Sequence, residues 1–195
     1  MNIALMLTLG RILLSPVFLV VYLFHAQLGI SMLMLPFILL GIVAIAELSD
    51  LFDGMAARKQ NQVTELGKIL DPLADSIFRL SVFLAFTQGI VQLPLWLVLF
   101  FFYRDSIISM LRTLCALRGF TLAARFSGKV KAVVQCCASI MILGLMIPQV
   151  LGIIPLTLFQ DLSFYIASGA VVYTLFSGVE YLYANQSYIK KALVK

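Results

Sequence analysis

Long apolar runs separated by short polar segments extend over the whole chain. Each run approaches the length of about 20 mainly apolar residues that a bilayer-crossing helix needs, and each is bounded by Gly, Pro or charged residues. The pattern predicts helices over residues 8–25, 30–57, 66–89, 94–117, 128–148 and 162–184. We expect residues 1–7 to form a short interfacial segment. Pro16 and Pro36 are predicted to lie inside the first two helices, where neighbouring helices can satisfy the freed backbone groups.

The composition supports the same picture. Of the 195 residues, 62% are hydrophobic and only 12% are charged, and the mean hydropathy is +1.05, which is far from the values of a soluble domain. We therefore expect an all-α integral membrane protein with six transmembrane helices, in which residues 1–195 form a single membrane domain. This arrangement leaves no room for a separate soluble domain.

The positively charged residues all fall on one side of the six-helix arrangement. They are Arg11, Arg58, Lys59, Lys68, Arg79, Arg104, Arg112, Arg118, Arg125, Lys129, Lys131, Lys190, Lys191 and Lys195. The opposite loops carry none, so the positive-inside rule places both termini and the charged loops in the cytoplasm, and the protein in the inner (cytoplasmic) membrane. Arg79, Arg104 and Arg112 lie within or at the ends of apolar segments, where a charge is costly. Topology alone does not explain these three residues.

Four aspartates are concentrated around the end of the second predicted helix and the start of the third. Asp50 and Asp53 are three residues apart, so on a helix they share one face. Asp71 and Asp75 are four apart and do the same on the next helix. Antiparallel packing of these two helices would bring the pairs together, and four carboxylates that meet there need cations to stay ionised. Their hard oxygen atoms favour two divalent ions, Mg²⁺ or Mn²⁺.

A salt-bridged patch is the alternative interpretation, with Arg58, Lys68 and Arg79 paired to the aspartates. The small residues between the two pairs favour a binding site instead, because they let a large ligand approach the helix backbones. These residues are Gly54, Ala56, Ala57 and Gly67. In a binding site of this kind, Arg58 would contact a phosphate group of the ligand.

The segment "DLFDGMAAR" (residues 50–58), followed after eight residues by "GKILDPLAD" (67–75), resembles the complete motif of the CDP-alcohol phosphotransferases. The resemblance implies a six-helix membrane enzyme with a cytoplasmic cavity, which transfers a substituted phosphate from a CDP-linked donor to an alcohol and releases CMP. It also implies metal binding by Asp50, Asp53, Asp71 and Asp75, and a general-base role for Asp75. By the same resemblance, the residues that line the nucleotide site are Gly54, Ala57, Arg58 and Gly67.

Cations that follow the motif bear on the identity of the alcohol. Arg104 and Arg112 are eight residues apart, roughly on one helix face. Lys129 and Lys131 stand at the start of the fifth predicted helix, where backbone amides also favour an anion. These four residues predict a pocket for a phosphate group, so the acceptor should be phosphorylated. As a whole the chain is most similar to the phosphatidylglycerophosphate synthase branch of the family, which implies CDP-diacylglycerol as donor and glycerol 3-phosphate as acceptor.

Several alternatives remain open at this point. Within the same reaction class, the acceptor could be inositol phosphate, or the reaction could transfer choline or ethanolamine phosphate from a CDP-linked donor to diacylglycerol. Outside the class, a cation-coupled transporter would also use intramembrane aspartates. A non-catalytic membrane scaffold is a further alternative, but it would give the four aspartates no purpose. Membrane lipid is an expected partner and nucleic acid is not. A homodimer is compatible with the sequence, because lipid-facing and dimer-forming helix surfaces look alike.

Overall fold

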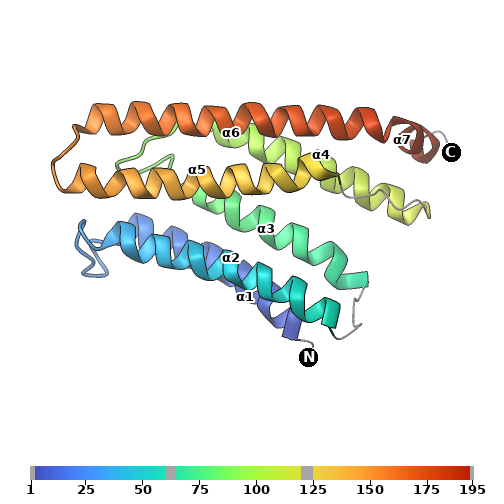
Figure 1. Cartoon of the computed structure of the whole chain (residues 1–195), viewed down its shortest axis with the longest axis horizontal. Helices are drawn as coiled ribbons and strands as arrows, with labels where there is room; N and C mark the ends of the chain where they lie inside the picture. The colour runs from blue at the N-terminus through green and yellow to red at the C-terminus, as the bar shows by residue number, and fades with distance from the viewer. Residues whose placement is uncertain (1–2, 60–64, 120–124, 194–195) are drawn as a thin grey trace.

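Helices joined by short loops make up the part of the protein that the computed structural model describes, which comprises residues 3–59, 65–119 and 125–193 (Figure 1). Side chains are described for residues 8–49, 72–115, 117–119 and 125–189. The helices are α1 (Ile3–Phe24), α2 (Leu35–Lys59), α3 (Glu65–Ala85), α4 (Leu95–Leu117), α5 (Phe126–Val150), α6 (Leu156–Ala184) and α7 (Gln186–Leu193). These ranges contain no strand, which confirms the predicted all-α class.

The first two helices begin at different residues from those predicted. α1 begins at Ile3 rather than at residue 8, because nothing in this apolar stretch breaks a helix. The interfacial location expected for residues 1–7 stays a prediction. α2 begins at Leu35, five residues later than predicted, after a turn in which the Leu35 amide donates to the Ser31 carbonyl at 3.1 Å. Pro36 therefore lies in the first turn of α2, where its missing N–H is not needed.

The last two helices also differ from the prediction. α6 begins at Leu156 rather than at residue 162, directly after Pro155, whose extended backbone (ψ 153°) ends the preceding loop. α7 was not predicted, because its eight residues contain no long apolar run. The helix is set off from α6 by Asn185, whose side-chain amide donates to the Tyr181 carbonyl at 2.9 Å.

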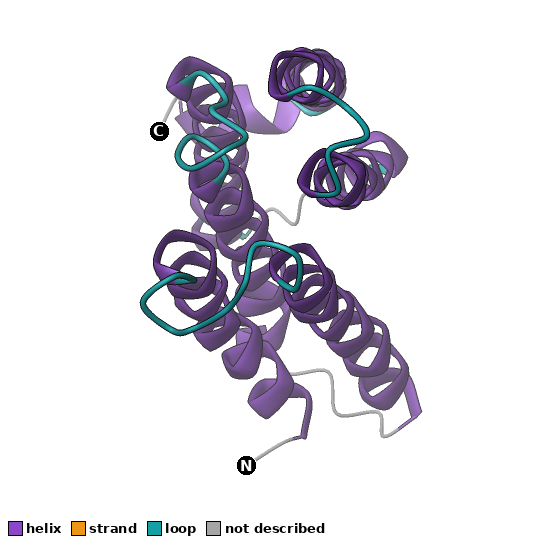
Figure 2. Ribbon diagram, turned by 90° about the vertical axis from the view of Figure 1, so that its left-hand side faces the viewer, coloured by secondary structure: helices purple, strands orange, loops and turns teal. Residues whose placement is uncertain are grey.

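Helices α1 to α6 run back and forth along the long axis of the molecule (Figure 1). Both chain termini lie at one end, where α2 and α4 also finish. The loops at residues 25–34, 86–94 and 151–155 lie at the other end, which faces the viewer in Figure 2. This alternation agrees with the predicted up-and-down order of the helices. It places the cation-bearing parts of the helices on the side of the bundle where both termini lie.

Helix α1 packs against both α2 and α3, and α5 packs along α6. In the part of the chain that the structure describes, the backbones of α2 and α3 are not in direct contact, whereas the expected approach of the two aspartate pairs involves side chains outside that part and stays a prediction. The separation of the two backbones is topological, because α1 contacts both of them. α2 and α3 still approach through side chains, since Arg79 Nη1 of α3 lies 3.7 Å from Glu47 Oε1 of α2.

Aromatic packing holds together the end of the bundle opposite the termini. The rings of Phe83 and Phe101 join α3 to α4 with centroids 4.6 Å apart, a contact type that contributes about 1 kcal/mol beyond area burial. The Tyr22 hydroxyl donates to the Gln88 carbonyl at 2.9 Å. Gly89 adopts a φ of +66°, and a Cβ there would lie 3.0 Å from the Tyr22 hydroxyl oxygen, so this turn requires glycine. The helices are therefore held together at the end of the bundle that lies opposite the termini.

Two of the described helices, α5 and α6, are long and apolar enough to cross a membrane. The apolar stretches of α1 and α2, Thr8–Phe24 and Leu35–Ser49, are shorter. Large apolar side chains are also exposed along the bundle, among them Val172 and Val179 of α6, each 68% exposed. An apolar surface of this kind marks contact with lipid or with another protein.

Candidate active site

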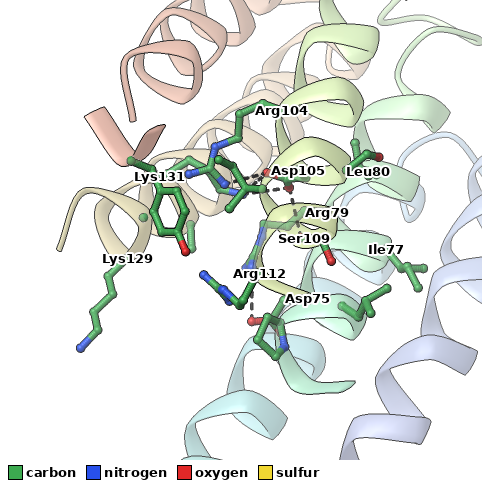
Figure 3. Close-up of a pocket in the computed structure, with 18 of the residues that line it drawn as sticks. Asp75, Ile77, Arg79, Leu80, Arg104, Asp105, Ser109, Arg112, Lys129 and Lys131 are labelled. Atoms are coloured by element: carbon green, nitrogen blue, oxygen red, sulfur yellow. Dashed lines mark hydrogen bonds and ion pairs between the residues drawn. The ribbon is translucent and has the colours of Figure 1, made fainter. Parts of the chain in front are cut away.

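A cavity of about 1220 Å³ lies within the bundle and is lined by residues of α2, α3, α4, α5 and α6. It brings together five residues that the sequence analysis assigned to a site: Asp75, Arg104, Arg112, Lys129 and Lys131 (Figure 3). These residues come from three different helices. The last aspartate of the motif and the downstream cations therefore line one cavity, which does not by itself assign their roles.

Asp75 projects from α3 on the cavity wall, and its side chain is 20% exposed. Its carboxylate pairs with Arg11 of α1, whose side chain is almost fully buried. The second partner is Arg79, one turn further along α3, whose Nη2 lies 3.3 Å from Asp75 Oδ2. Two guanidinium groups thus neutralise this carboxylate. The Arg79 contact agrees with the alternative interpretation, in which nearby cations form salt bridges with the aspartates. The Arg11 contact was not predicted from the sequence.

Asp105 of α4 is the centre of a second polar cluster, and it is only 7% exposed. Lys131 Nζ donates to both of its carboxylate oxygens, at 2.8 and 2.9 Å. Arg104 Nη1 donates to Oδ1 at 3.0 Å, and the Ser76 hydroxyl donates to Oδ2 at 3.1 Å. Two of the predicted phosphate-binding cations are therefore already ion-paired. The neighbouring positions of Arg104 and Asp105 suggest the first pairing, whereas nothing in the sequence indicates the pairing of Lys131 with Asp105.

Arg104 is also held from the side of α6. Its Nη2 donates to the Ser177 hydroxyl at 3.1 Å. A Cβ built on Gly178 would lie 3.1 Å from Arg104 Cγ, so the missing side chain of this glycine makes room for the arginine stem. Arg104 consequently reaches the cavity in one defined position.

Arg112 and Lys129 differ from this pair, because neither forms an ion pair with any side chain that the structure describes. The Arg112 guanidinium lies over the ring of Tyr181, 5.9 Å from its centroid, a cation–π contact that leaves its donors available. Its Nε is buried and has no hydrogen-bond partner among the described residues. Lys129 is exposed, and its side chain points away from the Asp105 cluster in Figure 3.

A third polar contact lies where α5 begins. Arg125 precedes α5 and donates from Nε to Glu180 Oε1 of α6 at 2.9 Å. The Ser127 hydroxyl donates to the other carboxylate oxygen of Glu180. Arg125 also lines the cavity. The start of α5, which carries Lys129 and Lys131, is thereby tied to the end of α6.

Several predicted residues lie outside the described side chains: Asp50, Asp53, Gly54, Ala57, Arg58, Gly67 and Asp71. Their backbones belong to α2 and α3, as predicted except for Arg58, which the prediction placed just after the second helix. Among the side chains that are described, no group of three or more His, Cys, Asp or Glu is placed to hold a metal ion. Three of the four predicted ligands lie outside the described side chains, so the predicted metal site stays a prediction.

Comparison with known proteins gives consistent matches over most of the chain. Residues 1–176 match the family model described as CDP-alcohol phosphatidyltransferase. The chain is 33% identical over 190 residues, covering 94% of this chain and 95% of the relative, to a Bacillus subtilis protein named CDP-diacylglycerol–glycerol-3-phosphate 3-phosphatidyltransferase. It is 31% identical to a Rickettsia typhi protein of the same name, with coverages of 93% and 96%. A probable phosphatidylglycerophosphate synthase of Mycobacterium tuberculosis is 29% identical, with coverages of 93% and 80%.

Proposed function

Because the chain belongs to the CDP-alcohol phosphatidyltransferase family, we propose that it transfers the phosphatidyl group of CDP-diacylglycerol to glycerol 3-phosphate. The products are phosphatidylglycerophosphate and CMP. One observation carries the proposal beyond the family match: a single cavity contains both the last aspartate of the motif and cations suited to a second phosphate group. A donor diphosphate and an acceptor phosphate can therefore be held in one site.

In the proposed reaction, the acceptor hydroxyl oxygen forms a bond to the phosphorus that carries the diacylglycerol. The bond from this phosphorus to the CMP oxygen breaks, and its electron pair leaves with CMP. The hydroxyl proton passes to the carboxylate of Asp75, which lies on the cavity wall. Arg79 and Arg11 hold that carboxylate from two sides, so it is oriented before the alcohol arrives.

The four aspartates of the motif fit two divalent ions, because all of their potential ligand atoms are carboxylate oxygens. One of these aspartates, Asp75, lines the cavity. Asp50, Asp53, Asp71 and Asp75 would hold the two ions. When bound, Mg²⁺ or Mn²⁺ supplies positive charge that neutralises the diphosphate and the leaving CMP. We assign contacts with the nucleotide to Gly54, Ala57, Arg58 and Gly67, on the basis of the motif.

The acceptor phosphate is proposed to bind to the cations downstream of the motif. Arg112 and Lys129 make the direct contacts, because the described side chains leave their charges uncompensated. Arg104 and Lys131, which Asp105 holds, form the adjoining wall of the same anion site. The first turns of α5 add backbone amides that favour an anion.

The membrane arrangement is part of the same proposal. We infer that α1 to α6 all span the inner (cytoplasmic) membrane, with both termini and the cavity mouth on the cytoplasmic side. The alternating helix order and the location of the cations support this orientation (Figure 1). The exposed apolar surface fits lipid, and part of it could also be covered in a homodimer.

The test of this function is a CMP-release assay on detergent-purified protein with CDP-diacylglycerol and Mg²⁺ or Mn²⁺. The acceptors offered in parallel are glycerol 3-phosphate, inositol phosphate and diacylglycerol, the last together with CDP-choline or CDP-ethanolamine as donor. We expect rapid release only with glycerol 3-phosphate. Release with inositol phosphate alone would overturn the acceptor, and no release with any acceptor would overturn the proposed enzyme activity.

Replacement of Arg112 tests the acceptor-phosphate assignment. We expect Arg112→Ala to raise the KM for glycerol 3-phosphate by roughly 10- to 100-fold, since a hydrogen bond to a charged group contributes about 1.5–3 kcal/mol. Lys129→Ala should have a smaller effect, because this residue is exposed and solvent screens its charge. The KM for CDP-diacylglycerol should stay within about twofold in both variants.

Arg118→Ala is the matched control for these variants, because Arg118 is exposed and does not line the cavity. Its kinetic constants should equal those of the unchanged protein. The assignment is wrong if Arg112→Ala leaves the acceptor KM unchanged, or if it raises the donor KM by the same factor.

A further inference from the structure

The buried Asp105 cluster contains a carboxylate that the proposed reaction does not use. Asp105 lies on α4, between α3 and α5, and accepts hydrogen bonds from residues on both neighbours. With Arg104 on its own helix, it receives donors at both carboxylate oxygens. Asp105 therefore links three of the helices that line the cavity (Figure 3).

The stability of the fold does not by itself explain why a charged cluster is buried around Asp105. A buried ion pair gains little over well-packed apolar residues, because desolvation of the charges offsets their attraction. The cluster here also pairs two cations, Arg104 and Lys131, with one described carboxylate, so a positive charge remains in excess beside the cavity. Such an excess suits an anion that binds next to it.

Ser76 gives the cluster a second connection, because it directly follows Asp75 on α3. Its hydroxyl donates to Asp105 Oδ2 at 3.1 Å, while the opposite oxygen, Oδ1, accepts from Lys131 at 2.8 Å. One carboxylate thus connects the turn of α3 that carries the reacting aspartate with the cations of α4 and α5. When an acceptor molecule is bound, its hydroxyl group would lie beside Asp75 on α3, and its phosphate group would lie beside the cations of α4 and α5.

We propose that Asp105 is a positioning residue that fixes the spacing between Asp75 and the acceptor-phosphate cations, and thereby selects acceptors by the distance between hydroxyl and phosphate. This inference rests on the proposed function, because it assumes a phosphorylated alcohol as acceptor. We assign Asp105 no direct contact with a substrate, because both of its carboxylate oxygens already accept hydrogen bonds from protein side chains. It acts through Lys131 and Arg104 on one side and through the Ser76 hydroxyl on the other.

The experiment uses acceptors that differ only in length: hydroxyalkyl phosphates with two, three or four carbons between the hydroxyl and the phosphate. Glycerol 3-phosphate has three carbons between its terminal hydroxyl and its phosphate. The purified protein should use the three-carbon acceptor with the highest kcat/KM. Ser76→Ala removes one hydrogen bond, so the preference for three carbons should fall by about 2- to 10-fold, and Asp105→Asn should reduce it further.

Ser76→Thr is the matched control, because it keeps the hydroxyl, and it should keep the length preference. The melting temperature and the KM for CDP-diacylglycerol are measured for every variant, since a role in folding alone would change these and leave the preference intact. The proposal is overturned if Ser76→Ala and Asp105→Asn keep the original preference, or if Ser76→Thr loses it as fully as Ser76→Ala does.

Failure of the proposed function gives a different result from failure of this inference. If the unchanged protein releases CMP with another phosphorylated alcohol but not with glycerol 3-phosphate, the acceptor assignment fails. The length series is then built on that alcohol, and the same comparison of Ser76→Ala with Ser76→Thr decides the role of Asp105. If glycerol 3-phosphate is the acceptor and the variants keep the length preference, only the inference about Asp105 fails.

Discussion

Asp75→Asn is expected to reduce CMP release by roughly a thousandfold or more, while binding of the CDP-linked donor persists. General-base catalysis contributes about 10²- to 10⁴-fold, and the amide that replaces the carboxylate cannot take the hydroxyl proton. Asparagine has nearly the same shape as aspartate, but it lacks the charge that pairs with Arg11 and Arg79, so the melting temperature is measured beside the turnover rate. The turnover rate is measured by CMP release, and donor binding by calorimetry with CDP-diacylglycerol in detergent.

The control for this prediction is Asp161→Asn, which changes an exposed aspartate on α6 that does not line the cavity. It should leave both turnover and donor binding unchanged. An equal loss of turnover and donor binding in Asp75→Asn would count against the base assignment. Such a result would instead fit a role of Asp75 in binding alone.

Removal of divalent ions is expected to reduce CMP release by a comparably large factor. After chelation, CMP release should fall to background, and Mg²⁺ or Mn²⁺ should restore it, because the charge of the diphosphate would otherwise be left uncompensated. A binding readout separates the site from the reaction: Mn²⁺ titration followed by electron paramagnetic resonance should give about two bound ions per chain. Asp71→Asn should lower that number or weaken the binding.

Two outcomes would contradict the metal assignment. The first is full turnover by chelated protein, and the second is Mn²⁺ binding that Asp71→Asn does not alter. Asp161→Asn again serves as the control, because it removes one carboxylate outside the cavity and should leave the Mn²⁺ titration unchanged.

The sequence predicted the elements of the fold well, because the apolar runs are long and their boundaries carry Gly, Pro or charge. It was less accurate at helix starts, where local turn chemistry decides. The hydrogen bond from Leu35 to Ser31 precedes α2, and Pro155 directly precedes α6. Neither feature interrupts the apolar pattern, so hydropathy alone could not locate these starts.

The sequence indicated which charged residues line the cavity better than it indicated how they pair. Asp75, Arg112 and Lys131 were identified from spacing and charge, and the cavity contains all three. The pairing of Lys131 with Asp105 joins residues 26 positions apart on different helices, and local periodicity cannot show such a contact. Spacing within one helix reveals only which residues share a face.

Arg11 illustrates the same limit. In the sequence it served only to orient the chain, although it stands inside an apolar run and such a charge usually has a partner. The partner, Asp75, is 64 residues away, and the contact exists because α1 packs against α3. Hydropathy and residue spacing favour packing of α2 against α3, and they do not indicate that α1 contacts both helices and brings Arg11 to Asp75.

Transfer of an isotope label from glycerol 3-phosphate into lipid is the decisive measurement for the proposed reaction. Purified protein is incubated with CDP-diacylglycerol, Mg²⁺ or Mn²⁺ and labelled glycerol 3-phosphate, and both the lipid product and CMP are quantified. We expect one labelled phosphatidylglycerophosphate for each CMP released. CMP release without label in the lipid, or no CMP release at all, would overturn the proposed reaction.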